Sequence, residues 1–349
     1  MIFKKEKFFN ENIHILVTGG AGFIGGCLIR RLLQETNAKI FNLDKLSYAS
    51  NLSWLKNTPN SQNHKLINLD LIDFDQTKEA IDLIDPDFVF HLAAESHVDR
   101  SIEGPEVFIK SNILGTFNLL ESLRLHWDKL NQNRKDFFKI HHISTDEVFG
   151  SLPRIGSFNE FTRYDPRSPY SASKASSDHL VRAWFHTFGL PIIITNCSNN
   201  FGPWQYPEKL IPLTILNAIN DIPIPIYGDG CNIRDWLFVE DHINALLLVA
   251  EKGKIGSTYC IGGHGEKSNL NIVLDICSML DKMIKKKSPH KNLIKFVKDR
   301  PGHDKRYSID SSLLKKEFNW KPLNSFEVNL KNTISWYIKN QAWCKKSKF

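Results

Sequence analysis

One stretch near the N-terminus constrains the fold more than any other. A short apolar run at residues 13–17 opens directly into a glycine-rich segment at residues 18–25, and a helical pattern follows through Leu33. The glycines that fit GxGxxG or the related GxxGxxG are Gly19, Gly20, Gly22 and Gly25. Glycines at such spacing permit a tight turn and let backbone N–H groups approach a pyrophosphate at the helix N-terminus. We therefore predict an α/β chain with a Rossmann-type, doubly wound parallel sheet that binds a dinucleotide.

The next predicted strand, residues 39–43, ends in Asp44. This acidic residue follows the glycines by close to the roughly 20 residues at which a carboxylate takes the adenosine ribose hydroxyls. A carboxylate repels the 2′-phosphate of NADP, so Asp44 favours NAD, while the neighbouring Lys45 is the argument for NADP. We predict NAD as the cofactor.

Further buried strands are predicted at residues 65–69, 88–94, 138–143, 191–196 and 258–261. Open α/β sheets bind ligands at the carboxyl ends of their strands, which makes Asp70 and Leu71 candidate adenine contacts. The polar residues 95–101 and 129–135 are predicted to be loops.

Polar groups gather where the strand at residues 138–143 ends. Thr145 supplies a hydroxyl there, and Asp146 and Glu147 supply two carboxylates, although solvated loop carboxylates would give the same pattern. One predicted helix later, Tyr170 and Lys174 stand four residues apart after Pro169 and so share a helix face. A YxxxK arises by chance about once in a chain of this size, so its value lies in this setting.

Length, composition and charge limit the possible domain organisation and partners. The 349 residues allow a major and a minor domain, and proline and glycine become dense after residue 198. We predict an NAD-binding domain at residues 1–198 plus 237–262 and a nucleotide-sugar-binding lobe at 199–236 plus 263–349. The net charge of +7 is too modest to predict a nucleic-acid partner.

Neither a membrane nor a metal is expected as a partner. No apolar run approaches the roughly 18 residues of a membrane span, and residues 1–11 carry charges where a signal peptide needs an apolar core. The six cysteines are scattered without metal-ligand spacing and are predicted to be reduced thiols. These features predict a cytoplasmic protein without a structural metal.

Taken together, the glycine-rich turn, Thr145, Tyr170 and Lys174 resemble the extended short-chain dehydrogenase/reductase family, in its nucleotide-sugar branch. Residues 44–49, 91–102, 144–150, 199–200 and 299–303 are similar, more specifically, to the dTDP-glucose 4,6-dehydratase family. The resemblance runs from about residue 13 to residue 343. It implies a homodimer that pairs through the helices near residues 108–125 and 170–188.

The resemblance also implies roles for individual residues. It implies NAD contacts at Phe23, Ile24, Asp44, Lys45, Leu46, Ser47, Asp70, Leu71, Ala93, Ala94, Ser111, Tyr170, Lys174 and Asn200, beside the turn glycines Gly19, Gly22 and Gly25. It implies substrate contacts at His97, Thr145, Asn199, Lys209, Leu210, Pro225, Ile226, Tyr227, Arg234, Asn269, Asp299, Arg300, Pro301, Gly302 and His303.

The activity implied by the resemblance is the conversion of dTDP-glucose to dTDP-4-keto-6-deoxyglucose and water, as in deoxysugar (rhamnose-type) biosynthesis. A free tyrosine has a pKa of about 10, and the adjacent Lys174 charge would lower that of Tyr170 enough for it to act as a base. Thr145 would add a hydrogen bond. Tyr170 would take the O4 proton as hydride leaves C4, Glu147 would take the C5 proton, and Asp146 would protonate the departing O6.

Two other functions are compatible with most of these residues. A 4-epimerase, or another enzyme acting on a UDP-sugar, would use Tyr170 and Lys174 without needing two carboxylates. A non-catalytic NAD-binding regulator has no need to retain Thr145, Tyr170 and Lys174, so the presence of all three argues against this interpretation.

Overall fold

The computed structural model describes residues 13–347, and the chain divides into two compact units. The first unit comprises residues 13–148, 166–196 and 243–259, and the second comprises 149–165, 197–242 and 260–347. Residues 1–11, which the sequence predicts are not a signal peptide, lie outside the described residues. Each unit has its own buried apolar core.

A seven-stranded sheet forms the centre of the first unit. Its strand order is β11 (Thr258–Ile261), β6 (Ile192–Cys197), β5 (Lys139–Thr145), β4 (Phe88–His91), β1 (His14–Thr18), β2 (Lys39–Asp44) and β3 (His64–Asn68). The strands from β5 to β3 pair in parallel, and Leu16 of β1 lies opposite Phe41 on one side and Val89 on the other. Because the order reverses at β1, the sheet has the switch point where doubly wound folds bind ligands. The predicted Rossmann-type fold is confirmed.

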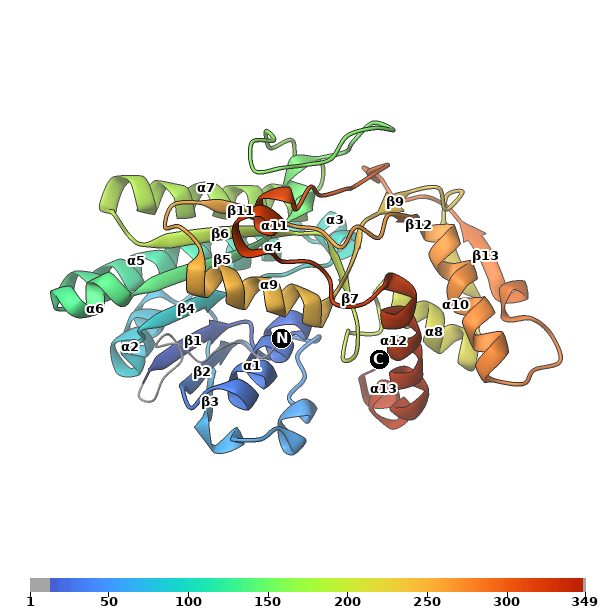
Figure 1. Cartoon of the computed structure of the whole chain (residues 1–349), viewed down its shortest axis with the longest axis horizontal. Coiled ribbons are helices and arrows are strands. Elements are labelled where there is room, and N and C mark those ends of the chain that lie inside the picture. The colour runs from blue at the N-terminus through green and yellow to red at the C-terminus, as the bar shows by residue number, and fades with distance from the viewer. Residues whose placement is uncertain (1–12, 348–349) are drawn as a thin grey trace. The chain divides into compact units, whose positions relative to one another are not determined.

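Helices cover this sheet on both faces (Figure 1). The helices α2 (Phe74–Ile84), α5 (Gly115–Lys129) and α7 (Pro169–Phe188) pack side by side in one layer. On the other side of the strands, α1 (Phe23–Glu35) is joined to α9 (Val239–Lys252) by a 2.9 Å bond from Arg31 to Asn244. Leu16, Val89 and Leu119 are completely buried between sheet and helices, which fixes the register of the strands.

The sequence around α7 explains why that helix begins and ends where it does. The Ser168 hydroxyl accepts a bond from the Ser171 amide at 3.1 Å, and the Ser171 hydroxyl accepts one from the Ser168 amide at 2.9 Å. This capping box precedes Pro169 at the first helical position, and Gly189 ends the helix at φ 72°. The start of α7 is therefore set locally, which fixes the positions of Tyr170 and Lys174.

Several predicted boundaries were wrong. Strand β4 ends at His91 rather than residue 94, because His97 caps a short helix, α3 (Val98–Glu103), inside the predicted loop. The predicted loop at 129–135 holds the end of α5 and the start of α6 (Gln132–Phe137), which Asn131 caps. Between α4 (Pro105–Phe108) and α5, residues Ile109–Leu114 form a π-helical segment, η4.

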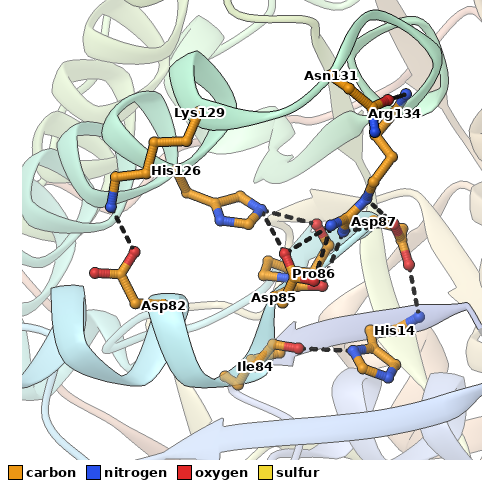
Figure 2. Close-up of polar contacts among 10 residues, drawn as sticks. All are labelled: His14, Asp82, Ile84, Asp85, Pro86, Asp87, His126, Lys129, Asn131 and Arg134. Atoms are coloured by element: carbon orange, nitrogen blue, oxygen red, sulfur yellow. Dashed lines mark hydrogen bonds and ion pairs between the residues drawn. The ribbon is translucent and has the colours of Figure 1, made fainter.

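A polar cluster holds the amino ends of β1 and β4 together (Figure 2). Arg134 donates to both carboxylate oxygens of Asp85 at 2.8 Å and to Asp87 at 2.7 Å. Asp87 in turn accepts the His14 amide at 3.0 Å, and the His14 ring lies 2.7 Å from the Ile84 carbonyl. Because ligands bind at the opposite, carboxyl ends of the strands, we assign this cluster to the scaffold.

The second unit packs α8 (Leu210–Ile219), α10 (Asn269–Met283) and α12 (Phe326–Lys339) around a core that includes Ile215, Ile276 and Tyr337. Three small sheets pair β8 (Ile224–Tyr227) with β13 (Ile294–Val297), β7 (Asn199–Phe201) with β10 (Trp236–Phe238), and β9 (Ile233–Arg234) with β12 (Lys267–Ser268). The second unit also contains η6 (His290–Leu293), α11 (Ser312–Phe318) and α13 (Gln341–Ser347). The first unit contains η2 (Ser53–Asn57) and η3 (Ser61–Asn63), and η5 (Asp146–Phe149) starts in the first unit and ends in the second.

The division into units differs from the predicted domains chiefly at residues 149–165. That segment groups with the second unit because Phe158 bridges to Ile309 and its amide bonds to Ser308 at 2.8 Å. Residues 237–242 group there as well, since β10 pairs with β7. The assignment of NAD to one domain and the sugar to the other stays a prediction. Among the described residues, no helix is long and apolar enough to cross a membrane.

Candidate active site

The glycine-rich turn after β1 has the geometry of an anion cradle. Gly22 is the N-cap of α1, so no side chain covers the first amides of that helix. A Cβ on Gly25 would lie 2.3 Å from the Gly19 carbonyl oxygen, and one on Gly19, at φ +73°, would lie 2.7 Å from the Ala93 backbone. Only glycine fits either position, and the N-terminus of α1 has no side-chain cap, which suits the binding of a pyrophosphate there.

Asp44 stands at the carboxyl end of β2 and is only 8% exposed. Its carboxylate accepts bonds from the amides of Ala21 at 2.9 Å and Leu46 at 2.8 Å, and from the Ser50 hydroxyl at 3.2 Å. These three donors hold the carboxylate beside the glycine-rich turn. Asp44 is therefore fixed at the switch point, where a ribose contact is expected.

A pocket of about 540 Å³ adjoins these residues at the ends of β2 and β3. The predicted cofactor residues Lys45, Ser47 and Asp70 line it, as does Glu95, which was not predicted. Leu71 is buried, and its carbonyl accepts a bond from Asn118 at 2.8 Å. A glycine cradle, a fixed acidic residue and an adjoining polar pocket fit a dinucleotide.

The loop after β4 is tied to the glycine-rich turn. Thr18 lies 2.7 Å from Nδ1 of His91, and its hydroxyl accepts the Ala93 amide at 3.2 Å. Burial, and next the neighbouring His142, keep the pKa of His91 well below its usual value. The neutral ring also lies 3.0 Å from Thr116. This arrangement places Ala93, Ala94 and then His97 at the end of the strand beside β1.

The strand-end cluster lies at the end of β5 and the start of η5. The Thr145 hydroxyl donates to Asp146 at 3.3 Å and accepts the Glu147 amide at 3.3 Å. Asp146 is 1% exposed and Glu147 is half-buried, so the alternative of two solvated loop carboxylates was wrong. The carboxyl groups of Asp146 and Glu147 therefore have different surroundings, as separate acid and base roles require.

Tyr170 and Lys174 lie on one face of α7, which packs on β5. Both side chains are nearly buried, at 8% and 4% exposure. The Lys174 ammonium donates to the Ile143 carbonyl at 3.0 Å, two residues before Thr145 along the strand. The pair predicted from its spacing is thereby anchored to the strand that carries the predicted catalytic hydroxyl and carboxylates.

A buried network beneath these residues was not predicted. Asp178, one turn after Lys174, lies 2.9 Å from Nε2 of His142 and accepts the Ser144 hydroxyl at 2.8 Å. Asn196 of β6 donates to Asp178 at 3.4 Å and to the Thr145 carbonyl at 3.0 Å. The sequence signal was available in the four-residue steps from Tyr170 to Lys174 to Asp178, which place all three on one face of the helix.

Among the residues predicted to hold the nucleotide-sugar, four gather within the second unit. The His303 ring lies 2.6 Å from Asp299 and meets the Tyr227 ring edge-on at 6.4 Å. Burial, and next the charge of Arg300, lower the pKa of His303. The cluster combines an aromatic ring, a histidine and a guanidinium, groups suited to a base and a phosphate.

Arg234 lies in the same unit and is 5% exposed. Its guanidinium stacks 4.2 Å above the Tyr307 ring and donates to the carbonyls of Ile233 at 2.8 Å and Asp304 at 2.9 Å. The neighbouring Asn269 begins α10, and its amide bonds to the Asn232 carbonyl at 3.0 Å. Arg234 is thus a preorganised cation.

The remaining predicted residues are more dispersed. Lys209 caps α8, which Leu210 begins, and Pro225 and Ile226 belong to β8. Asn199 and Asn200 form part of β7 in the second unit, where the Asn200 side chain bonds to the Ser198 carbonyl at 3.0 Å and to His242 at 2.9 Å. Pro301 and Gly302 form a turn between Asp299 and His303, at which Gly302 has φ 64°.

Comparisons with known proteins find relatives that match nearly the whole chain. The family model described as GDP-mannose 4,6 dehydratase matches residues 16–333. A dTDP-glucose 4,6-dehydratase from Salmonella typhimurium is 51% identical over 338 residues, which cover 94% of both chains.

Solved structures give the same result. A dTDP-glucose 4,6-dehydratase from Bacillus anthracis in complex with NAD has a TM-score of 0.84 and 41% identity, covering 96% of this chain and 100% of that chain. Another dTDP-glucose 4,6-dehydratase, from Streptomyces venezuelae with NAD and TYD bound, has a TM-score of 0.87 and 37% identity, covering 96% and 99%.

Proposed function

Because the chain belongs to the GDP-mannose 4,6 dehydratase family, we propose that it converts dTDP-glucose to dTDP-4-keto-6-deoxyglucose and water. It is an NAD-dependent hydro-lyase, as its relatives at about half identity indicate. The observation that carries the assignment to a dehydratase is the pair Asp146 and Glu147, one buried and one half-buried, on the strand end held by Thr145 and Lys174.

The first unit would hold the cofactor. The N-terminus of α1 would bind the pyrophosphate, Asp44 the adenosine ribose, and the pocket lined by Ser47 and Asp70 the adenine. Bound NAD would supply the hydride acceptor and donor for the redox chemistry at C4 and C6 of the sugar. The chain's own residues would carry the protons.

Tyr170 would remove the proton from O4 as C4 is oxidised. The positive charge of Lys174 on the same helix face favours the phenolate, and burial strengthens that interaction. The bond from Lys174 to the Ile143 carbonyl holds the ammonium in place. Thr145, at the end of the same strand, would hydrogen-bond to the reacting oxygen.

The 4-ketone acidifies the adjacent C5 proton, and elimination then needs a base and an acid. Glu147, half-buried, would take the C5 proton, and Asp146, in its protonated form, would donate to O6 as water leaves. As hydride is added at C6, Glu147 would return a proton to C5. The proton that Tyr170 took from O4 offsets the one that Asp146 gave to the departing water, so the sugar loses one water without net oxidation.

Substrate recognition is proposed for the second unit. Arg234, and Arg300 beside His303, would bind the diphosphate, and Tyr227 would stack on the base. We also propose selectivity for dTDP over UDP, because similar proteins are named dTDP-glucose 4,6-dehydratases.

The test is incubation of the purified protein with dTDP-glucose and with UDP-glucose, following the 4-keto-6-deoxy product by its alkaline absorbance. We expect product from dTDP-glucose and a loss of turnover in Tyr170→Phe. Epimerised sugar without the keto product would instead support a 4-epimerase. Bound NAD without turnover on either substrate would support a regulator.

We propose that the protein forms a homodimer and that the interface is a stripe of exposed apolar side chains along α4, η4, α5 and α7. The stripe consists of Val107, Ile109, Leu114, Phe117 and Phe188, which are 38% to 51% exposed. Exposed apolar side chains on elements that pack against one another are typical of an interface between subunits. The proposed location is the cytoplasm, a reducing compartment in which cysteine side chains remain thiols.

A further inference from the structure

Lys45 directly follows Asp44 and could, in principle, reverse the preference of the site for NAD. In sites that take NADP, a basic side chain near the acidic position accommodates the 2′-phosphate. Lys45 lines the pocket next to Asp44 and is 28% exposed in its side chain, so its location suits that role. Its contacts decide whether the charge is available.

The Lys45 ammonium is held by two partners. It lies 2.7 Å from a carboxylate oxygen of Glu95 and donates to the Ser111 hydroxyl at 2.7 Å. The Glu95 side chain is 13% exposed, so this ion pair is screened less than a surface pair. Two of the three ammonium donors are therefore occupied by side chains of the protein.

Glu95 is itself held in position. The Asn112 side chain accepts the Glu95 amide at 2.8 Å and donates to the Glu95 carbonyl at 3.0 Å. Asn112 is 1% exposed and also donates to Ser173 of α7 at 2.8 Å. The backbone that carries the Glu95 carboxylate is thus fixed by the core, and Lys45 adapts to it.

The charges around the pocket lead to the same conclusion. Its lining carries one cation, Lys45, and three carboxylates, Asp70, Asp73 and Glu95. With the cation paired, a 2′-phosphate would face unpaired negative charge, whereas the uncharged 2′-hydroxyl of NAD would not.

We propose that Glu95 is a cofactor-specificity residue, which selects NAD against NADP by holding the Lys45 ammonium away from the 2′ position. This inference rests on the proposed placement of the adenosine ribose at Asp44. It does not depend on the reaction at the sugar.

The experiment measures bound nucleotide rather than turnover. The protein is equilibrated with an equimolar mixture of NAD⁺ and NADP⁺ until the bound ratio is constant, and the nucleotides are released and quantified by mass spectrometry. In Glu95→Gln we expect the bound NADP-to-NAD ratio to rise about fivefold to tenfold, as for release of one partly buried charge. Glu95→Asp, which keeps the charge but shortens the reach to Lys45, should show a smaller rise.

Two controls separate this mechanism from a general charge effect. Asp73→Asn removes a carboxylate that lines the same pocket but bonds to Gln76 and not to Lys45, so it should raise the ratio by much less than Glu95→Gln does. Adding Lys45→Met to Glu95→Gln should abolish the rise. An unchanged ratio in Glu95→Gln, an equal rise in Asp73→Asn, or a rise that survives Lys45→Met would each overturn the proposal. A wild-type protein that binds neither nucleotide would instead contradict the proposed function.

Discussion

Nε2 of His142 lies 2.9 Å from a carboxylate oxygen of Asp178, and both side chains are completely buried. Burial alone would raise the pKa of Asp178, but the bonds from His142 and Ser144 and the charge of Lys174 hold it below its usual value. The ionised carboxylate therefore acts as a buried acceptor between α7 and β5.

Replacing this acceptor should destabilise the protein. Asp178→Asn leaves a buried donor on β5 or β6 without a full partner, so we expect the free energy of unfolding to fall by about 1–3 kcal/mol. Urea denaturation measures the change. Asp82→Asn is the matched control, because Asp82 pairs with Lys129 at 3.0 Å on the surface (Figure 2) and should change stability by less than about 0.5 kcal/mol. Equal effects of the two substitutions would contradict the assignment.

Glu147→Gln should separate the oxidation at C4 from the elimination. Without the base, we expect turnover to fall by roughly a hundredfold or more, because general base catalysis by one side chain contributes about that much. Solvent deuterium should no longer enter C5 of the sugar, as monitored by mass spectrometry, while C4 oxidation persists. Glu106→Gln, on the surface of α4, is the control. Undiminished exchange at C5 would remove Glu147 as the base.

Acid should destabilise the second unit through His242. Burial lowers the pKa of this ring to about 3, from an unfolded value of 6.5. The unfolded chain therefore binds more protons below pH 6.5, so stability is present above that pH and is lost as the pH falls toward 3. The loss from this residue should approach about 1.4 kcal/mol per pH unit within that window.

His242→Asn should flatten this dependence, since asparagine does not titrate and can still bond to Asn200. Urea denaturation at several pH values between 4 and 7 would measure the slope. The exposed His186 of α7 provides the control as His186→Asn. If both variants retain the wild-type slope, His242 does not carry the effect.

The proposed dimer can be tested at Phe117. This side chain is 38% exposed and meets the Trp184 ring at 5.7 Å, which joins α5 to α7. Phe117→Glu places a charge in the apolar stripe and should produce a monomer at micromolar concentration by light scattering after size exclusion. Leu83→Glu replaces a side chain that is 75% exposed on α2 and should leave the mass unchanged. A wild-type monomer would contradict the proposal directly.

The sequence alone determined the features that depend on neighbouring residues. The glycine-rich turn, the acidic end of β2 and the start of α7 are set by steric limits, strand length and capping within a few residues. Tyr170 and Lys174 share a face because the helix period requires it. The Rossmann-type fold follows from the same local patterns, which the seven-stranded sheet confirms.

Only the tertiary structure decided which distant side chains meet. Lys45 pairs with Glu95, and His142 with Asp178, because β2, β4, β5 and α7 are brought together by burial of both faces of one sheet. The sequence alone left the charge of Lys45 as an argument for NADP and left Asp146 as a possible surface group. Burial and pairing are properties of the packed chain, since they depend on which apolar faces exclude water together. Packing shows that Asp146 is buried, and the pairing of Lys45 with Glu95 is the basis for our proposal that its charge does not favour NADP.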